Sequence, residues 1–241
     1  MAIPKIIHYC WFGGKEKPDN VQKCIESWKK YLPEYKLIEW NEQNFEVNNL
    51  RYTKEAYHAG KYAFVSDVAR IEALYKYGGI YMDTDVEVLR TFNSLLDAKC
   101  ILGMEEKEYV ATSFMAFESK HPLVKEFIDL YQNLSFYDKN GKIITGTNVA
   151  KLTNMLIKKG FVRENYYQEL KDGIRIYPKE YFSPYDYINC HYEITEKSYC
   201  VHHFAVTWMS SKEQFKKKIK RNLVKIIGAD RMNYLRNTIR K

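Results

Sequence analysis

Hydrophobic and polar positions follow two alternating periods along the first ninety residues. Short apolar runs typical of strands cover residues 5–12, 35–40 and 80–82. Between them, apolar residues recur with helical spacing over residues 21–32, 53–61 and 66–77, and Ser66 is the expected N-cap of the third helix. Strands separated by helices predict an α/β sheet that begins with parallel pairing. Ligands of such sheets bind beyond the carboxyl ends of the strands.

The remainder of the chain mixes strand and helix patterns. Strand candidates lie at residues 86–89, 100–104, 112–117, 174–178 and 199–205, and helices are expected after Pro122 and over residues 147–159. From Glu213 the pattern is that of a basic amphipathic helix, interrupted by Gly228. We therefore predict one α/β domain over residues 1–211 and a basic helical tail over residues 212–241.

Composition narrows the class of protein. A chain of 241 residues that is 46% hydrophobic can bury a sizeable core. The five cysteines are scattered and form no CxxC pair, which argues against a disulfide framework or a zinc site and favours reduced thiols in the cytoplasm. No apolar run reaches the roughly 18 residues of a membrane-spanning helix, and the N-terminus lacks a signal-peptide pattern.

The positive charge is concentrated at one end of the chain. Residues 212–241 carry eleven Lys or Arg against two acidic residues, so the tail holds +9 and the rest about −1 of the net +8. Such a tail can bind nucleic acid or an anionic membrane, or remain a solvated charge run. Its regular apolar stripe favours a half-buried surface, in lipid or on the body, and it lacks the aromatic interleaving of nucleic-acid binders. We expect no nucleic-acid partner, and a peripheral position at the inner face of the plasma membrane.

Two carboxylates follow the third predicted strand. Asp83 and Asp85 come after Gly78-Gly79 and a short apolar run, and in an extended segment they project to the same side. Two such carboxylates repel each other unless a cation lies between them. The pattern predicts a divalent metal site that takes further ligands from a diphosphate. Surface carboxylates after a strand are the alternative.

Other candidates surround this pair in the predicted topology. Asp67 and Arg70 lie three residues apart on the preceding helix, either facing the site or forming a surface ion pair. Trp11 follows the first strand and either stacks on a planar base or packs in the core. His202 and His203 lie in a predicted strand and so face opposite sides. At most one of them can reach the metal, and a packed core histidine is the alternative for each.

Three segments together resemble the family 32 glycosyltransferases: IPKIIHYCWFGG, SDVARIEALYKYGGIYMDTDVE and VHHFAVTW. This family includes bacterial polysaccharide sugar transferases and the Och1-like mannosyltransferases, and the same segments are similar to the glucosyltransferase domain of clostridial toxins. The resemblance implies a GT-A fold, a nucleotide-diphospho-sugar donor, Mn²⁺ or Mg²⁺, and retention of anomeric configuration.

The resemblance also implies roles for individual residues. For the donor, Trp11 would stack on the nucleobase, Asp67 and Arg70 would bind the sugar, and Trp208 would contact the leaving diphosphate. Asp83 would contact the ribose or the sugar.

For the metal, the resemblance implies direct binding by Asp85, with Asp83 binding directly or through water or the nucleotide. His203, five residues before Trp208, would complete the coordination.

We therefore expect a metal-dependent retaining hexosyltransferase of surface polysaccharide synthesis that acts on a glycan or lipid-linked acceptor. UDP-glucose or UDP-galactose is the expected donor, with GDP-mannose as the alternative. Residues 111–116 and 145–148 are expected to line the pocket. The competing hypotheses are a metal-dependent phosphodiesterase, which calls for further Asp/His clusters, and a non-catalytic anion-binding protein that uses the tail.

Overall fold

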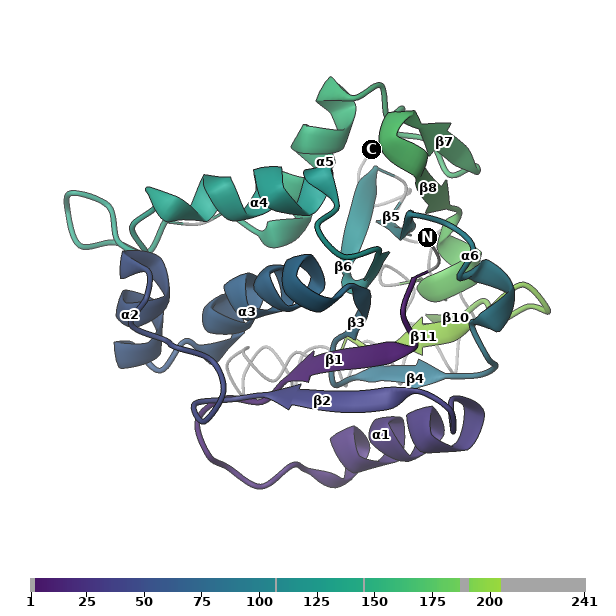
Figure 1. Cartoon of the computed structure of the whole chain (residues 1–241), viewed down its shortest axis with the longest axis horizontal. Coiled ribbons are helices and arrows are strands. Elements are labelled where there is room, and N and C mark those ends of the chain that lie inside the picture. Colours follow the sequence, from purple (N-terminus) through teal and green to yellow (C-terminus); the bar gives the residue numbers. More distant parts are fainter. Residues whose placement is uncertain (1–2, 107, 145, 187–190, 205–241) are drawn as a thin grey trace, which may run out of the picture.

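The first half of the chain forms the predicted parallel core of a sheet. The computed structural model describes residues 3–106, 108–144, 146–186 and 191–204. Strand β1 (Ile6–Cys10) lies between β2 (Lys36–Trp40) and β3 (Gly79–Met82) and is parallel to both. The connecting helices are α1 (Asp19–Tyr31), α2 (Arg51–His58) and α3 (Tyr62–Tyr77). Because β1 and β3 run in the same direction, Trp11 and Asp83 both follow strands that end at one edge of the sheet (Figure 1).

Four further strands complete a mixed sheet of seven, in the order β2-β1-β3-β6-β5-β8-β7. They are β5 (Cys100–Glu106), β6 (Tyr109–Phe117), β7 (Gln168–Leu170) and β8 (Ile174–Tyr177). Strand β6 is antiparallel to both β3 and β5, while β8 is parallel to β5. Helices α4 (Pro122–Gln132), α5 (Asn148–Lys158) and α6 (Lys179–Phe182) and the short turns η1 (Asn93–Leu95) and η2 (Lys171–Gly173) complete this part. The expected mixed α/β sheet flanked by helices is confirmed.

Two small sheets lie outside the large one. Strand β4 (Val86–Val88) pairs with β11 (Cys200–His202), and β9 (Tyr185–Asp186) pairs with β10 (His191–Tyr192), both antiparallel. The chain therefore leaves the large sheet at the end of β3 and joins a different sheet after the three residues 83–85. The predicted tail over residues 212–241 and Trp208 lie outside the described residues. None of the helices in the described part is long and apolar enough to cross a bilayer.

The large sheet is buried on both faces, because successive side chains of its strands enter two different core clusters. In β3, Ile80 and Met82 pack with Trp28 of α1, whereas Tyr81 between them packs with Val68 of α3. Figure 1 shows α3 and α4 on one side of the sheet and α1 on the other. This layered packing explains why the strand runs in the sequence are almost continuously apolar.

Helix α3 begins earlier than the sequence predicts. Ser66 was the expected N-cap, but the helix starts at Tyr62, and the Ser66 hydroxyl donates to the Tyr62 carbonyl oxygen four residues back. Gly60, at φ +66, ends the preceding turn and leaves the chain free to start the helix at once. The extra turn brings the Tyr62 ring over the loop that follows β1, where a Cβ on Gly13 would lie 2.3 Å from it.

Strand β3 begins with a glycine that leaves no room for a side chain beside β1. Gly79 has φ +100, and a Cβ there would lie 2.7 Å from the carbonyl oxygen of Ile6. Gly78, at φ +64, ends α3. Both glycines are thus required by the backbone, and they determine where the Asp83–Asp85 segment leaves the sheet.

His8 holds the start of this turn in place. Its Nε2 lies 2.8 Å from the Gly78 carbonyl oxygen, and its Nδ1 lies 3.1 Å from the indole Nε1 of Trp40. A carbonyl only accepts and an indole N–H only donates, so the neutral ring protonated at Nε2 satisfies both bonds. Burial lowers the pKa of His8 from 6.5 to about 4, although the bond to Gly78 opposes this shift.

We predict that His8 makes folding sensitive to acid. Its pKa is lower in the folded than in the unfolded chain, so its contribution is complete above about pH 6.5 and is lost as the pH falls towards 4, a change of about 3 kcal/mol. Denaturant unfolding of the wild type and of His8→Gln at several pH values should show their stability difference shrinking over this window. A difference independent of pH would contradict this account.

Candidate active site

The Asp83–Asp85 segment is fixed by two sheets at once. The backbone N–H of Asp83 donates to the carbonyl of Ser113 in β6 at 2.8 Å, and the N–H of His203 donates to the carbonyl of Asp85 at 3.0 Å. The N–H of Val86 also donates to the carbonyl of Asp83, which closes a turn. The segment is therefore a turn, not the extended strand end that the sequence predicts.

The turn nevertheless brings the two carboxylates together. Asp83, Asp85 and His202 each offer a potential metal ligand atom, and these atoms lie within 4.8 Å of one another. The His202 Nε2 lies 3.3 Å from Asp85 Oδ1. Its Nδ1 is buried, and no described residue is within hydrogen-bond range of it. A set of two carboxylates and one imidazole fits a divalent ion such as Mn²⁺.

The structure places His202, and not the expected His203, beside the carboxylates. His203 Nε2 lies 2.8 Å from Glu87 Oε2, and its Nδ1 lies 2.8 Å from the Tyr192 hydroxyl. The two histidines do face different neighbours, as strand alternation predicts. Since β11 is antiparallel to β4 and His202 pairs with Val86, the ring of His202 is the one next to Asp85.

The electrostatics of His202 also suit a cation site. Burial alone lowers the pKa of His202, but the adjacent Asp85 outweighs it and raises the pKa to about 9. The carboxylate that favours a proton on His202 would equally favour a bound cation beside it, since both are attracted by the same negative charge.

Arg70 lies between the carboxylate of the turn and that of α3. Its Nη1 is 3.3 Å from Asp83 Oδ1, and its Nη2 is 3.2 Å from Asp67 Oδ1. It also donates to the carbonyls of Ser66 and Thr112 at 3.2 and 2.8 Å. The side chain is only 7% exposed, so the Asp67–Arg70 pair is not the surface ion pair that was the alternative.

The ring of Tyr81 completes this cluster. The guanidinium lies 4.5 Å from the ring centroid, and the Tyr81 hydroxyl donates to Asp83 Oδ1 at 2.8 Å. Burial opposes the charge on Arg70, but Asp83, Tyr81 and Asp67 outweigh it and raise the pKa of Arg70. Most of its N–H groups are therefore engaged within the protein, which makes Arg70 a rigid support for two carboxylates.

Asp67 is a buried carboxylate with a raised pKa. Burial raises the pKa of Asp67 to about 6, with Arg70 opposing the shift and Asp83 adding to it. Its backbone carbonyl accepts from the Asn148 side-chain amide at 3.2 Å. Residues 111–116 and 146–148 thus reach the site through Thr112, Ser113 and Asn148.

Two residues of α5 lie beside Asp67. Asn148, the last residue of the expected 145–148 stretch, is buried and accepts a hydrogen bond from Tyr131 of α4. Lys151, one turn further along, lies 5.3 Å from the Tyr131 ring centroid and opposes the raised pKa of Asp67. Lys151 was not singled out in the sequence, because an isolated lysine on a helix carries no pattern and only its contacts identify it.

Trp11 lies at the edge of the site, partly exposed. Its indole N–H donates to the Lys15 carbonyl at 2.6 Å, and the Lys17 ammonium lies 5.7 Å from its ring centroid. Glu42 accepts from the backbone N–H of Gly13 at 2.6 Å and from the Tyr57 hydroxyl at 3.1 Å. This anchors the loop after β1 and leaves Trp11 outside the two core clusters.

A second group of potential ligands lies on the β9–β10 hairpin. It consists of Asp186, His191 and Glu193. The closest approach is 3.9 Å, between His191 Nδ1 and Asp186 Oδ2. These side chains are partly or fully exposed, an arrangement that is common without a bound ion.

The sequence around the turn matches a known family. Residues 18–102 match the glycosyltransferase sugar-binding region containing the DXD motif. Over this segment, about a third of its length, the chain is similar to the DXD-containing glycosyltransferases. The matched segment runs from α1 into β5 and contains Asp67, Arg70, Asp83 and Asp85.

Curated relatives of the chain are also glycosyltransferases. The chain is 31% identical over 134 residues to inositol phosphoceramide mannosyltransferase 3 of Schizosaccharomyces pombe, a match over 53% of this chain and 36% of the yeast protein. It is 30% identical over 124 residues to human lactosylceramide 4-alpha-galactosyltransferase, over 50% of this chain and 32% of the human protein. The matches thus span about a third of the length of these relatives.

Solved glycosyltransferases share the general arrangement more loosely. A glycosyltransferase involved in glycosylation of the PBCV-1 major capsid is 11% identical, with a TM-score of 0.48 over 90% of this chain and 99% of that one. The galactosyltransferase LgtC is 12% identical, with a TM-score of 0.44 over 90% and 94%.

We predict that Arg70 is essential for the stability of this protein. Arg70→Gln leaves Asp67 and Asp83 without their shared cation and should lower the free energy of unfolding by about 3 kcal/mol or more in metal-free buffer. Arg175→Gln is the matched control, because Arg175 pairs with Asp97 and Glu169 nearer the surface, with 28% of its side chain exposed. Its loss should be about 1 kcal/mol or less. Equal losses in the two variants would contradict the role assigned to Arg70.

Proposed function

We propose that the protein is a metal-dependent retaining hexosyltransferase that uses a nucleotide-diphospho-sugar donor. The observation that carries this proposal is the convergence of Asp83, Asp85 and His202 beside the Asp67–Arg70 pair. The match of residues 18–102 to the DXD-containing glycosyltransferase region supports it. Asp83, Asp85 and His202 would hold the ion, and a bound divalent cation would stabilise the negative charge that develops on the leaving diphosphate.

Asp67 is the proposed ligand of the donor sugar. Arg70 fixes one of its carboxylate oxygens at 3.2 Å, so the carboxylate has a defined direction in which to accept hydroxyl groups. Hydrogen bonds to sugar hydroxyls that strengthen as the ring gains oxocarbenium character favour the transition state over the bound substrate. Because Arg70 is itself held by carbonyls and carboxylates, we assign it to positioning Asp67 and Asp83.

We propose front-face displacement as the reaction. The acceptor hydroxyl oxygen bonds to the anomeric carbon while the bond from that carbon to the diphosphate oxygen breaks, and the hydroxyl proton passes to the departing phosphate. This route retains configuration without a covalent enzyme intermediate. A trapped glycosyl-enzyme would contradict it.

The partly exposed indole of Trp11 is the proposed platform for the nucleobase. An aromatic ring at a strand end stacks on any planar base, so it does not by itself select uracil over guanine. UDP-glucose or UDP-galactose is our proposed donor, and GDP-mannose is the alternative. The relatives named as a mannosyltransferase and a galactosyltransferase support both.

We propose a glycan or lipid-linked acceptor in surface polysaccharide synthesis. The two relatives carry the names of lipid acceptors, an inositol phosphoceramide and a lactosylceramide. The basic residues of 212–241 support action at an anionic membrane surface, at the cytoplasmic face.

We predict that a sugar nucleotide stabilises the protein only when a divalent ion is present. A thermal-shift panel of UDP- and GDP-sugars, each with and without Mn²⁺, should raise Tm for the true donor, because a ligand of the native state shifts the folding equilibrium. In Asp85→Asn the increment that depends on Mn²⁺ should disappear, with Tm of the free protein retained. No shift with any donor would overturn the proposal.

The products distinguish the competing enzyme class. A transferase releases the nucleoside diphosphate, whereas a phosphodiesterase cleaves the diphosphate and releases a nucleoside monophosphate with a sugar phosphate. Chromatography of the reaction with the stabilising donor separates these outcomes. A monophosphate product would favour the phosphodiesterase.

We predict that the full chain floats with vesicles of anionic lipid and does not float with neutral vesicles. A variant truncated after residue 211 should lose at least most of this binding, because each Lys or Arg near an anionic surface contributes about 1 kcal/mol. Raising the salt concentration should weaken binding of the full chain. Equal flotation of both forms would reject a membrane role for residues 212–241.

A further inference from the structure

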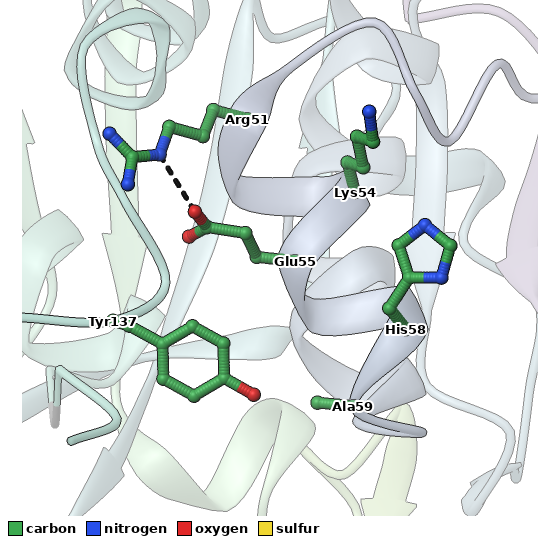
Figure 2. Close-up of a pocket in the computed structure, with 6 residues that line it drawn as sticks. All are labelled: Arg51, Lys54, Glu55, His58, Ala59 and Tyr137. Atoms are coloured by element: carbon green, nitrogen blue, oxygen red, sulfur yellow. Dashed lines mark hydrogen bonds and ion pairs between the residues drawn. The ribbon is translucent and has the colours of Figure 1, made fainter. Parts of the chain in front are cut away.

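A groove of about 410 Å³ lies along α2, outside the site described above. It is lined by Arg51, Lys54, Glu55, His58, Ala59 and Tyr137. Five of these come from successive turns of one helix face, and Tyr137 comes from the loop between α4 and α5 (Figure 2). The lining combines cationic side chains with one aromatic ring, which is the composition of a site for an anion attached to a sugar or similar group.

Glu55 builds the wall of this groove and pairs with one of its cations, Arg51. Its Oε1 accepts from Arg51 Nε at 2.7 Å, and its Oε2 accepts from the Ser135 hydroxyl and the Phe136 N–H, each at 2.8 Å. Burial works against the charge of this carboxylate, but these three donors outweigh it and lower the pKa of Glu55 to about 2. Glu55 thus fastens the loop to α2, and its oxygens are committed to that task.

The other two potential cations of the groove, Lys54 and His58, lie on a neighbouring strip of the surface of α2. Lys54 and His58 are four residues apart, and Figure 2 shows both side chains on the same side of α2. Both are exposed. Two groups at this spacing can donate to one phosphate, which offers three acceptor oxygens and up to two negative charges. Arg51, held at Nε by Glu55, keeps its outer N–H groups available at the end of the groove.

Residues next to the groove are hydrogen-bonded to segments of the proposed donor site. On α2, the residue before His58 is Tyr57, whose hydroxyl donates to Glu42, and Glu42 also accepts from the N–H of Gly13 after β1. The loop that carries Tyr137 runs on to Asn148, whose side-chain amide donates to the carbonyl of Asp67. The groove and the proposed donor site are therefore connected through α2 and this loop.

We propose that this groove binds the phosphate-bearing end of the acceptor, with Lys54 and His58 on the phosphate and the Tyr137 ring against the group that carries it. That the bound molecule is the acceptor depends on the proposed function. That it carries a phosphate is inferred from the groove alone. The phosphate can belong to a lipid headgroup or to a soluble phosphorylated glycan, which share this chemistry.

The test follows the ring signals of the six histidines by NMR in the full chain, with His58→Gln to assign the signal of His58. Glycerol phosphate is added without metal or sugar nucleotide, so the outcome does not depend on donor binding. We expect a saturable shift of the His58 signal. Binding should be about tenfold weaker in Lys54→Gln, because that variant loses one charge-assisted hydrogen bond to the phosphate. Lys29→Gln on the exposed face of α1 is the matched control and should bind as the wild type does.

Further arms identify the source of the phosphate and the alternatives. A shift of His58 with phosphatidylglycerol vesicles, absent with phosphatidylcholine, indicates a lipid headgroup, and a shift with glycerol phosphate alone indicates a soluble acceptor. Because the measurement reports on His58, vesicles that bind only to residues 212–241 would not produce the signal. The proposal is overturned if His58 does not shift in any arm, if acetate shifts it at the same concentration as glycerol phosphate, or if Lys54→Gln binds like Lys29→Gln.

Discussion

The guanidinium of Arg70 holds together the region where β3, β6 and α3 meet. It is buried, and it contacts a carboxylate from the helix and another from the turn after the strand. Either carboxylate alone would be costly to bury. With Arg70 between them, their directions are set before any ligand arrives. The proposed donor site therefore depends on a charge cluster that is part of the protein's packing, and binding does not have to assemble it.

Much of the fold could be predicted from the sequence, because its first half obeys simple periodicities. The apolar runs of β1, β2 and β3 are buried on both faces, so their patterns are nearly unbroken, and the parallel order follows from the helices between them. The predicted start of α3 was wrong because a serine such as Ser66 can cap a helix or, inside one, donate to the carbonyl four residues earlier. The small β4–β11 sheet could not be foreseen, since two three-residue strands carry no pairing information of their own.

The candidate site was predictable in its types of residue and less so in its geometry. Asp83 and Asp85 stood out by spacing, yet they converge through a turn and not through strand alternation. The sequence offers His202 and His203 equally, and only the register of β11 on β4 brings His202 to Asp85. Asn148 lay outside any motif, because its contact with Asp67 spans 81 positions in the chain.

The backbones of the two aspartates of the turn are hydrogen-bonded to different sheets. The backbone of Asp83 is hydrogen-bonded to β6 of the large sheet, while that of Asp85 is hydrogen-bonded to His203, the residue after β11 of the small one. The two sheets share one core cluster, in which Ile80 and Met82 of β3 pack with Val86, Val88 and Cys200 of the small sheet. The separation of the two carboxylates therefore depends on the packing between the sheets as well as on the turn. A substitution in this shared core would alter that separation with both aspartates unchanged, so the proposed ion site can be tuned through residues that do not touch it.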